Sequence, residues 1–289
     1  MTEWQKDVVP AARAAASAIA AQFGSSVLGV LFYGSCLRTG EVEDKILDFY
    51  VIVDSYNTAY SSTWMAMANK ILPPNVFYHE MEVEGITVRS KYAVLSFEDF
   101  IFRVSQTCLN VSVWARFCQP CMLLGVKNRA VERQMADHVS TAITTMLTNI
   151  VALKPEIRTS REIWIAAFEK TYASELRAEQ DDKGLEIYLL DQGRYDQLAP
   201  LVLTDLSVKN GGSSVAQFKW FLRKWNGKIV SFLRLLKASA TFDGGIDYLA
   251  WKIKRHSGVE IEIKHWMRKH PIIAGTVLFW KLRKKGAFK

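Results

Sequence analysis

The sequence has few cysteines. Its 289 residues include only Cys36, Cys108, Cys118 and Cys121, too few for a disulfide framework in a chain of this length and typical of a reducing compartment. Cys118 and Cys121 have the spacing of a redox or zinc half-site, but no second CxxC or histidine pair completes it. We therefore expect ordinary thiols.

Long apolar runs are also missing. No stretch of 18 or more apolar residues occurs, so we predict that the chain has no transmembrane helix. Glu3 and Asp7 stand where a signal peptide would be basic, and Arg13 interrupts the alanine-rich run at 11–21, which favours a surface helix. With 49% hydrophobic residues, the chain can bury a core, and we expect a soluble or peripheral protein of two domains.

Acidic residues are scarce at one end of the chain. Residues 251–289 contain eleven lysines and arginines against two glutamates, so this segment carries +9 while the whole chain carries +8. A cationic charge confined to one segment indicates an anionic partner, either lipid head groups or nucleic acid.

The hydrophobic pattern is mixed α/β in the first part of the chain and mainly helical afterwards. Four short runs are β-type, at 27–33, 47–53, 76–82 and 87–95, the last two forming a hairpin. From about residue 97 the pattern is helical, and three long helices are expected at 129–151, 160–178 and 214–238. We predict domains at 1–125 and 126–250, followed by a basic segment at 251–289.

One stretch carries recognisable chemistry. The first strand ends in Tyr33-Gly34-Ser35, and Asp48 begins the next strand about a dozen residues later, a pattern typical of polymerase-β-like nucleotidyltransferases. Glycine lets the backbone approach a triphosphate, serine donates to a phosphate oxygen, and the carboxylate holds Mg²⁺. The usual second acid would fall at Ile46 or Tyr50, and neither is acidic. The alternative for Gly34-Ser35 is an ordinary turn.

Five segments in one order carry a closer resemblance. They are 33–35 together with 47–49, 91–96, 115–120, 171–177 and 267–275. In these segments the chain resembles the mitochondrial-type CDP-diacylglycerol synthases, the translocator assembly and maintenance family of phosphatidate cytidylyltransferases, which also occurs in bacteria. That family likewise lacks the second acid. This chain departs from its pattern at Ala93, which replaces glycine, and at Glu175, which replaces aspartate.

The resemblance implies a polymerase-β-type α/β nucleotidyltransferase domain with a mainly helical second domain. It implies an enzyme of phospholipid biosynthesis that transfers CMP from CTP to phosphatidic acid and releases pyrophosphate, with Mg²⁺ as cofactor and no protein partner inferred. Catalytic roles fall to Asp48, Lys91 and Glu175, of which Asp48 and Glu175 would bind the metal. Six residues would bind substrate: Tyr33, Gly34, Ser35, Arg116, Tyr172 and Arg177. Lys91, Arg116 and Arg177 could instead be ordinary solvated or ion-paired residues.

The C-terminal segment is predicted to bind an anionic membrane surface. Its apolar run at 271–280 is too short to cross a hydrocarbon core of about 30 Å at 1.5 Å per residue, but it suits a segment that lies in the membrane plane. The predicted contacts are Phe279, Trp280, Lys281, Arg283, Lys284 and Lys285. The enzyme would then be cytoplasmic and peripheral on the inner face of the cytoplasmic membrane. A core helix with a solvated basic end is the alternative.

Further upstream, Lys219, Arg223, Lys224 and Lys228 could extend the same cationic face or be the polar side of a helix. Two other functions also stay open. One is nucleotidyl transfer to a soluble or nucleic-acid acceptor. The other is a catalytically inactive module that binds membrane or nucleic acid, which would be expected to have lost Ser35, Asp48 or Lys91.

Overall fold

The computed structural model describes most of the chain. The described residues are 4, 7–157, 159–175, 183–203, 213–241 and 262–269. Arg177 and the six predicted membrane contacts from Phe279 to Lys285 lie outside them.

The described residues form two compact units. The sheet unit contains residues up to Ser96, Met122–Val126 and residues from Arg234 onward, and the helical unit contains Phe97–Cys121 and Lys127–Leu233. Residues 97–121 fall in the helical unit, whereas the predicted boundary lay near 125. They do so because they pack on the helices that follow: the Thr145 hydroxyl donates to the carbonyl of Val104 over 2.8 Å.

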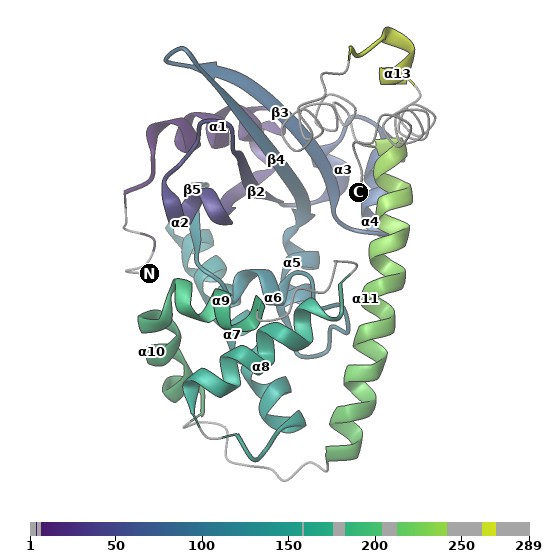
Figure 1. The fold of residues 1–289 in the computed structure, drawn as a ribbon. Coiled ribbons are helices and arrows are strands. Elements are labelled where there is room, and N and C mark those ends of the chain that lie inside the picture. The colour runs from purple at the N-terminus through teal and green to yellow at the C-terminus, as the bar shows by residue number, and fades with distance from the viewer. Residues whose placement is uncertain are drawn as a thin grey trace. The chain divides into compact units, whose positions relative to one another are not determined.

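A five-stranded mixed sheet forms the frame of the sheet unit (Figure 1). Its strands are β1 (Val27–Tyr33), β2 (Ile46–Val53), β3 (Asn75–Val83), β4 (Ile86–Ser96) and β5 (Cys121–Val126), in the order β3-β4-β2-β1-β5. β2 runs parallel to β4, while β1 pairs with β2 and β3 with β4 in antiparallel fashion. Four strands match the predicted runs. β5 was not predicted, since six apolar residues between helices do not distinguish a strand from a helix.

The two faces of this sheet differ in character. Helix α1 (Pro10–Ala21) packs on one face, where the alanines of the helix and Ile19 meet Phe32, Phe49 and Val94. Alternate residues of the strands point to the opposite face, and these include Tyr33, Asp48 and Lys91. Both faces bury apolar residues, since Leu31, Ile52 and Leu95 also point to the opposite face and are fully buried, but that face carries the polar groups as well.

Short helices precede β1 and connect the later strands. They are η2 (Gly24–Ser26), α2 (Ser35–Thr39), α3 (Tyr56–Ala59) and α4 (Thr63–Ile71). Asn69 on α4 is fully buried and holds this connection to the sheet, because its amide donates to the carbonyl of Val94 over 3.0 Å and accepts from the backbone N–H of Asn75.

The helical unit is built around large aromatic side chains. Its helices are α5 (Phe97–Val104), α6 (Trp114–Phe117), α7 (Arg129–Leu153), α8 (Ser160–Tyr172), α9 (Lys183–Leu190), α10 (Gln192–Leu203) and the part of α11 (Ser213–Thr241) up to Leu233; α13 (His265–Lys269) follows in the sheet unit. Trp164, Phe168 and Tyr195 are fully buried and in ring contact. None of the helices in the described part of the chain has the length and hydropathy needed to cross a bilayer.

Helix α8 begins as predicted but ends earlier. Thr159 and Glu162 form a reciprocal capping box at its start. The helix ends at Tyr172 and is followed by a turn, in which the hydroxyl of Ser174 donates to the carbonyl of Lys170 over 2.9 Å. The predicted helix continued to 178, because the apolar pattern does not reveal where a backbone turn begins.

Gly227 allows α11 to pack closely on this turn. A Cβ at position 227 would overlap the backbone oxygen of Ser174. Replacing a helical glycine by alanine normally stabilises a helix by up to about 1 kcal/mol, but here the added methyl group would push the two segments apart.

We expect Gly227→Ala to lower the free energy of unfolding by about 1–3 kcal/mol, the range for overpacking a filled contact. Gly193→Ala is the matched control, because Gly193 is also helical but has no atom near its missing Cβ. It should leave stability unchanged or raise it slightly. Urea unfolding of both variants followed by circular dichroism measures the difference, and equal stabilities would contradict the close contact.

Candidate active site

The turn after β1 has a backbone conformation that requires glycine. Gly34 has φ +95° and ψ −163°, a region essentially restricted to glycine, and α2 begins at the next residue, Ser35. A Cβ at position 34 would lie 3.1 Å from Oδ2 of Asp48. The absence of a side chain therefore has two effects: the chain can turn sharply after β1, and the carboxylate of Asp48 can lie against the turn.

Strand register aligns the predicted residues in one row. Tyr33 on β1 is opposite Asp48 on β2, Asp48 is opposite Lys91 on β4, and Lys91 is opposite Tyr78 on β3. The Lys91 Nζ lies 3.1 Å from Asp48 Oδ1, and the two side chains are 38% and 24% exposed. Gly34, Asp48 and Lys91 are thus adjacent on a face where both charged groups remain reachable from solvent.

The position of the missing second acid is occupied by an aromatic contact. Tyr50, two residues after Asp48, is nearly buried, and its ring centroid lies 5.5 Å from that of Tyr33. On the other side, Ile46 is opposite Arg89, whose guanidinium Nε lies 3.1 Å from Glu80 Oε2. Asp48 is therefore the acidic group that the second strand presents beside the glycine turn.

The donor set suits Mg²⁺ only with help from a substrate. No group of three or more His, Cys, Asp or Glu side chains suitable for a metal occurs among the described residues. Mg²⁺ commonly binds to one or two carboxylates and completes its coordination with water and substrate phosphates. The single carboxylate of Asp48 fits that pattern, and it does not fit a metal held by protein ligands alone.

A tyrosine and an ion pair complete this face, and neither was predicted. The hydroxyl of Tyr78 donates to Glu80 Oε2 over 2.5 Å. Burial, followed by the hydrogen bond and negative charge of Glu80, raises the pKa of Tyr78. In the sequence, Tyr78 and Glu80 are two residues apart in one strand and therefore point to the same face. That this face also carries Lys91 and Asp48 becomes visible only once strand pairing is known.

Three other predicted residues meet in the helical unit. Arg116 on α6, Tyr172 at the end of α8 and Glu175 beyond it line one small pocket with Ala115, Gln119 and Thr171. Its accessible volume is about 10 Å³, enough for about one water molecule. Residues 115–119 and 171–175, far apart in the sequence, are therefore neighbours. Asp48 belongs to the other unit, so its pairing with Glu175 around a metal stays a prediction.

The cysteine beside the glycine turn is not set up as a nucleophile. Cys36 is buried, and its thiol donates to the carbonyl of Ile46 over 3.1 Å. Burial, together with the negative charge of Asp48, raises the pKa of Cys36, although a hydrogen bond with Ser35 opposes the shift. Burial likewise raises the pKa of Cys118.

We expect Gly34→Ala to lower the free energy of unfolding by about 1–3 kcal/mol, because both the backbone conformation and the space are lost. Gly85→Ala is the control, since Gly85 has φ +80° but no atom near its missing Cβ. A double-mutant cycle by thermal unfolding isolates the contact: Gly34→Ala should be less harmful in an Asp48→Ala background. Strictly additive effects would refute the contact between Gly34 and Asp48.

The cysteines give a second prediction. All four are free and buried, so a thiol-specific reagent such as dithionitrobenzoate should react slowly with the native protein at neutral pH and rapidly with four thiols in guanidinium. A fast-reacting thiol in the native protein would contradict the burial and revive the redox interpretation of Cys118 and Cys121.

Comparison with known proteins gives little further identification. No protein-family model matches the chain, and no curated protein matches it. Among solved structures, the chain is similar to a nucleotidyltransferase-like protein from Exiguobacterium sibiricum 255-15. The aligned region covers 95% of this chain and 91% of that one, with 11% sequence identity and a TM-score of 0.28. A TM-score of this size establishes neither a shared fold nor a shared activity.

Proposed function

We propose that this chain is a nucleotidyltransferase that transfers CMP from CTP to phosphatidic acid, yielding CDP-diacylglycerol and pyrophosphate. The observation that carries the proposal is the row of Gly34, Asp48 and Lys91. A turn without a side chain, a carboxylate and an ammonium group lie together on one face of the sheet. These are the groups needed to hold a triphosphate.

Each group has a distinct task in substrate binding. The bare backbone at Gly34 lets a phosphate chain approach closely, and the hydroxyl of Ser35 can donate to a phosphate oxygen. Lys91 neutralises phosphate charge. An ion pair between partly exposed groups contributes about 0–1 kcal/mol, so Lys91 can exchange Asp48 for a phosphate oxygen at little cost.

Asp48 is the residue that would hold Mg²⁺ together with phosphate oxygens, and Glu175 stays the predicted second ligand. When bound, the metal would neutralise the charge that develops on the phosphates. Asp48 is held for this task by its position in β2, beside the turn at Gly34, and the ammonium group of Lys91 lies 3.1 Å from its Oδ1.

The chemistry of the acceptor requires little of the protein beyond positioning. A phosphate oxygen of phosphatidic acid forms a bond to the α-phosphorus of CTP. The bond from that phosphorus to the oxygen between the α- and β-phosphates breaks, and this oxygen leaves with pyrophosphate. A phosphate monoester is ionised at neutral pH and needs no general base, so orientation and charge neutralisation dominate. Arg116, which lines a pocket with Tyr172, is proposed to neutralise phosphate charge, and Arg177 is the proposed contact for the lipid phosphate.

Two features support a lipid acceptor over a soluble one. The first is the order of five segments that resemble phosphatidate cytidylyltransferases. The second is the concentration of cationic charge in residues 251–289, which suits a substrate embedded in an anionic surface.

The test is transfer of label from α-phosphate-labelled CTP to phosphatidic acid in detergent micelles with Mg²⁺. We expect labelled lipid from the wild type, at least about a hundredfold less from Asp48→Asn, and none after chelation of the metal. Because the ion pair is partly exposed, Asp48→Asn should change the free energy of unfolding by no more than about 1 kcal/mol.

Glu80→Gln is the matched control, because Glu80 lies on the same face of the sheet and pairs with Arg89 rather than with Lys91. It should keep most of the activity. Equal transfer by wild type and Asp48→Asn would remove Asp48 from the site. Binding of CTP without any labelled lipid would rule out phosphatidic acid and direct the search to another acceptor.

A further inference from the structure

Helix α11 exposes an unusually apolar surface. Eight of its apolar side chains are between 36% and 62% exposed. They are Val215, Phe218, Phe221, Leu222, Trp225, Ile229, Phe232 and Leu233, called here the α11 stripe. Contiguous exposed apolar surface of this kind marks a site of interaction with a protein or a membrane.

The stripe lies opposite the side by which α11 packs on its own unit. Successive helix residues are rotated by about 100°, which places Phe218, Trp225, Ile229 and Phe232 within about 60° of one another. The buried residues Ala216, Trp220, Arg223 and Gly227 fall on the opposite side. The helix therefore has two apolar faces. One packs on the helical unit, and the other is exposed.

The buried face is firmly attached. The Trp220 indole donates to the carbonyl of Asn149 over 3.2 Å, and the Arg223 guanidinium donates to Asn149 Oδ1 over 2.9 Å. Gly227 lies against the Ser174 backbone. The stripe is thus held outward by a fixed helix.

Charge on α11 is of one sign only. Residues 213–241 include six cationic residues and no acidic residue: Lys219, Arg223, Lys224, Lys228, Arg234 and Lys237. At about 100° per residue, Lys224 and Lys228 fall on one flank of the stripe and Lys219 on the other. Cations that flank an apolar stripe are typical of a helix lying in an anionic lipid interface.

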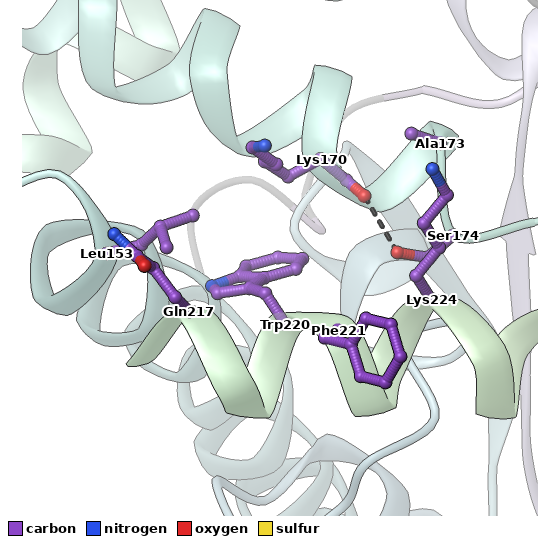
Figure 2. Close-up of a pocket in the computed structure, with 8 residues that line it drawn as sticks. All are labelled: Leu153, Lys170, Ala173, Ser174, Gln217, Trp220, Phe221 and Lys224. Carbon is purple, nitrogen blue, oxygen red and sulfur yellow. Dashed lines mark hydrogen bonds between the residues drawn. The ribbon is translucent and has the colours of Figure 1, made fainter. Parts of the chain in front are cut away.

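A pocket adjoins the stripe. Figure 2 shows its lining residues, which come from α11, the end of α7 and the end of α8. Its volume is about 290 Å³, near the lower end of the range for small-molecule sites. Leu153, Trp220 and Phe221 make its walls apolar, and Lys170 and Lys224 supply two cations. Phe221 belongs to both the pocket and the stripe, so the pocket lies beside it.

We infer that the α11 stripe docks on an anionic lipid surface and that the adjoining pocket receives part of one anionic lipid molecule. Apolar walls beside two cations fit a molecule with an acyl chain and a phosphate group. A second copy of the chain is a poorer partner, because pairing two stripes would bring cations together without any acidic residue from α11. The docking stands by itself, and only the identity of the lipid as substrate rests on the proposed function.

Site-specific labelling tests the docking directly. Because the four native cysteines are buried, an environment-sensitive dye will label Ile229→Cys selectively. Its emission should shift to the blue with vesicles of phosphatidylcholine and phosphatidylglycerol, and not with phosphatidylcholine alone. The same dye on Leu201→Cys, at an exposed position of α10, should show no shift.

Binding measurements give a second readout. The combined variant Phe218→Ser, Trp225→Ser and Phe232→Ser should sediment with anionic vesicles at least about tenfold more weakly, since three large apolar side chains no longer enter the interface. A control with Leu189→Ser, Leu190→Ser and Leu201→Ser removes exposed apolar residues outside the stripe. It should bind as the wild type does.

The pocket is tested with monodisperse short-chain phosphatidic acid. Ala173→Trp, which fills the pocket, should abolish its binding as measured by calorimetry while leaving vesicle sedimentation unchanged. Retained binding would overturn the pocket assignment.

Three results would overturn the docking: vesicle binding without a dye shift at position 229, wild-type sedimentation of the stripe variant, or a dye shift that grows with protein concentration in the absence of vesicles. None of these measurements contains CTP. A chain that docks but transfers no CMP would refute the proposed function and leave this inference intact.

Discussion

The candidate active site depends on the empty space beside the backbone of residue 34. The Asp48 carboxylate lies so close that a Cβ at residue 34 would be only 3.1 Å from its Oδ2, and the backbone there has a conformation essentially restricted to glycine. Asp48 can therefore lie close to a turn in which any other residue would be strained and would crowd the carboxylate. Parallel pairing of β2 with β4 then brings Lys91 to 3.1 Å from the same carboxylate. The absence of a side chain at residue 34 and the register of β2 with β4 therefore bring together the glycine turn, the carboxylate of Asp48 and the ammonium group of Lys91.

The two faces of the sheet carry different kinds of side chain. The α1 face is filled by alanines and aromatic rings, and Leu31, Ile52 and Leu95 are fully buried on the other face. On the other face, Tyr33 and Tyr50 pack against each other where a second acid is usual, so the site has one carboxylate from β2. This arrangement favours a metal shared with substrate phosphates over one bound permanently by the protein.

Helix α11 illustrates how one element can serve both the fold and a partner. Its small residues, Ala216 and Gly227, and its hydrogen-bonded Trp220 and Arg223 face the helical unit, whereas its largest apolar side chains face away from it. A helix with this much outward apolar surface and no acidic residue is well suited to an anionic interface. The predicted membrane contacts at Phe279–Lys285 belong to a different segment of the chain, which lies outside the described residues.

The sequence by itself determined the four strands at 27–33, 46–53, 75–83 and 86–96 to within a residue or so, because apolar runs bounded by turn residues specify strands locally. It also marked Gly34, Ser35 and Asp48 as a unit, since they are close in the chain. Tertiary structure alone decided that Lys91 is the partner of Asp48, that β5 joins the sheet, and that Arg116 meets Tyr172 and Glu175. It also decided which face of α11 is exposed. These outcomes depend on contacts between distant segments, and periodicity shows that a face is apolar without showing what covers it.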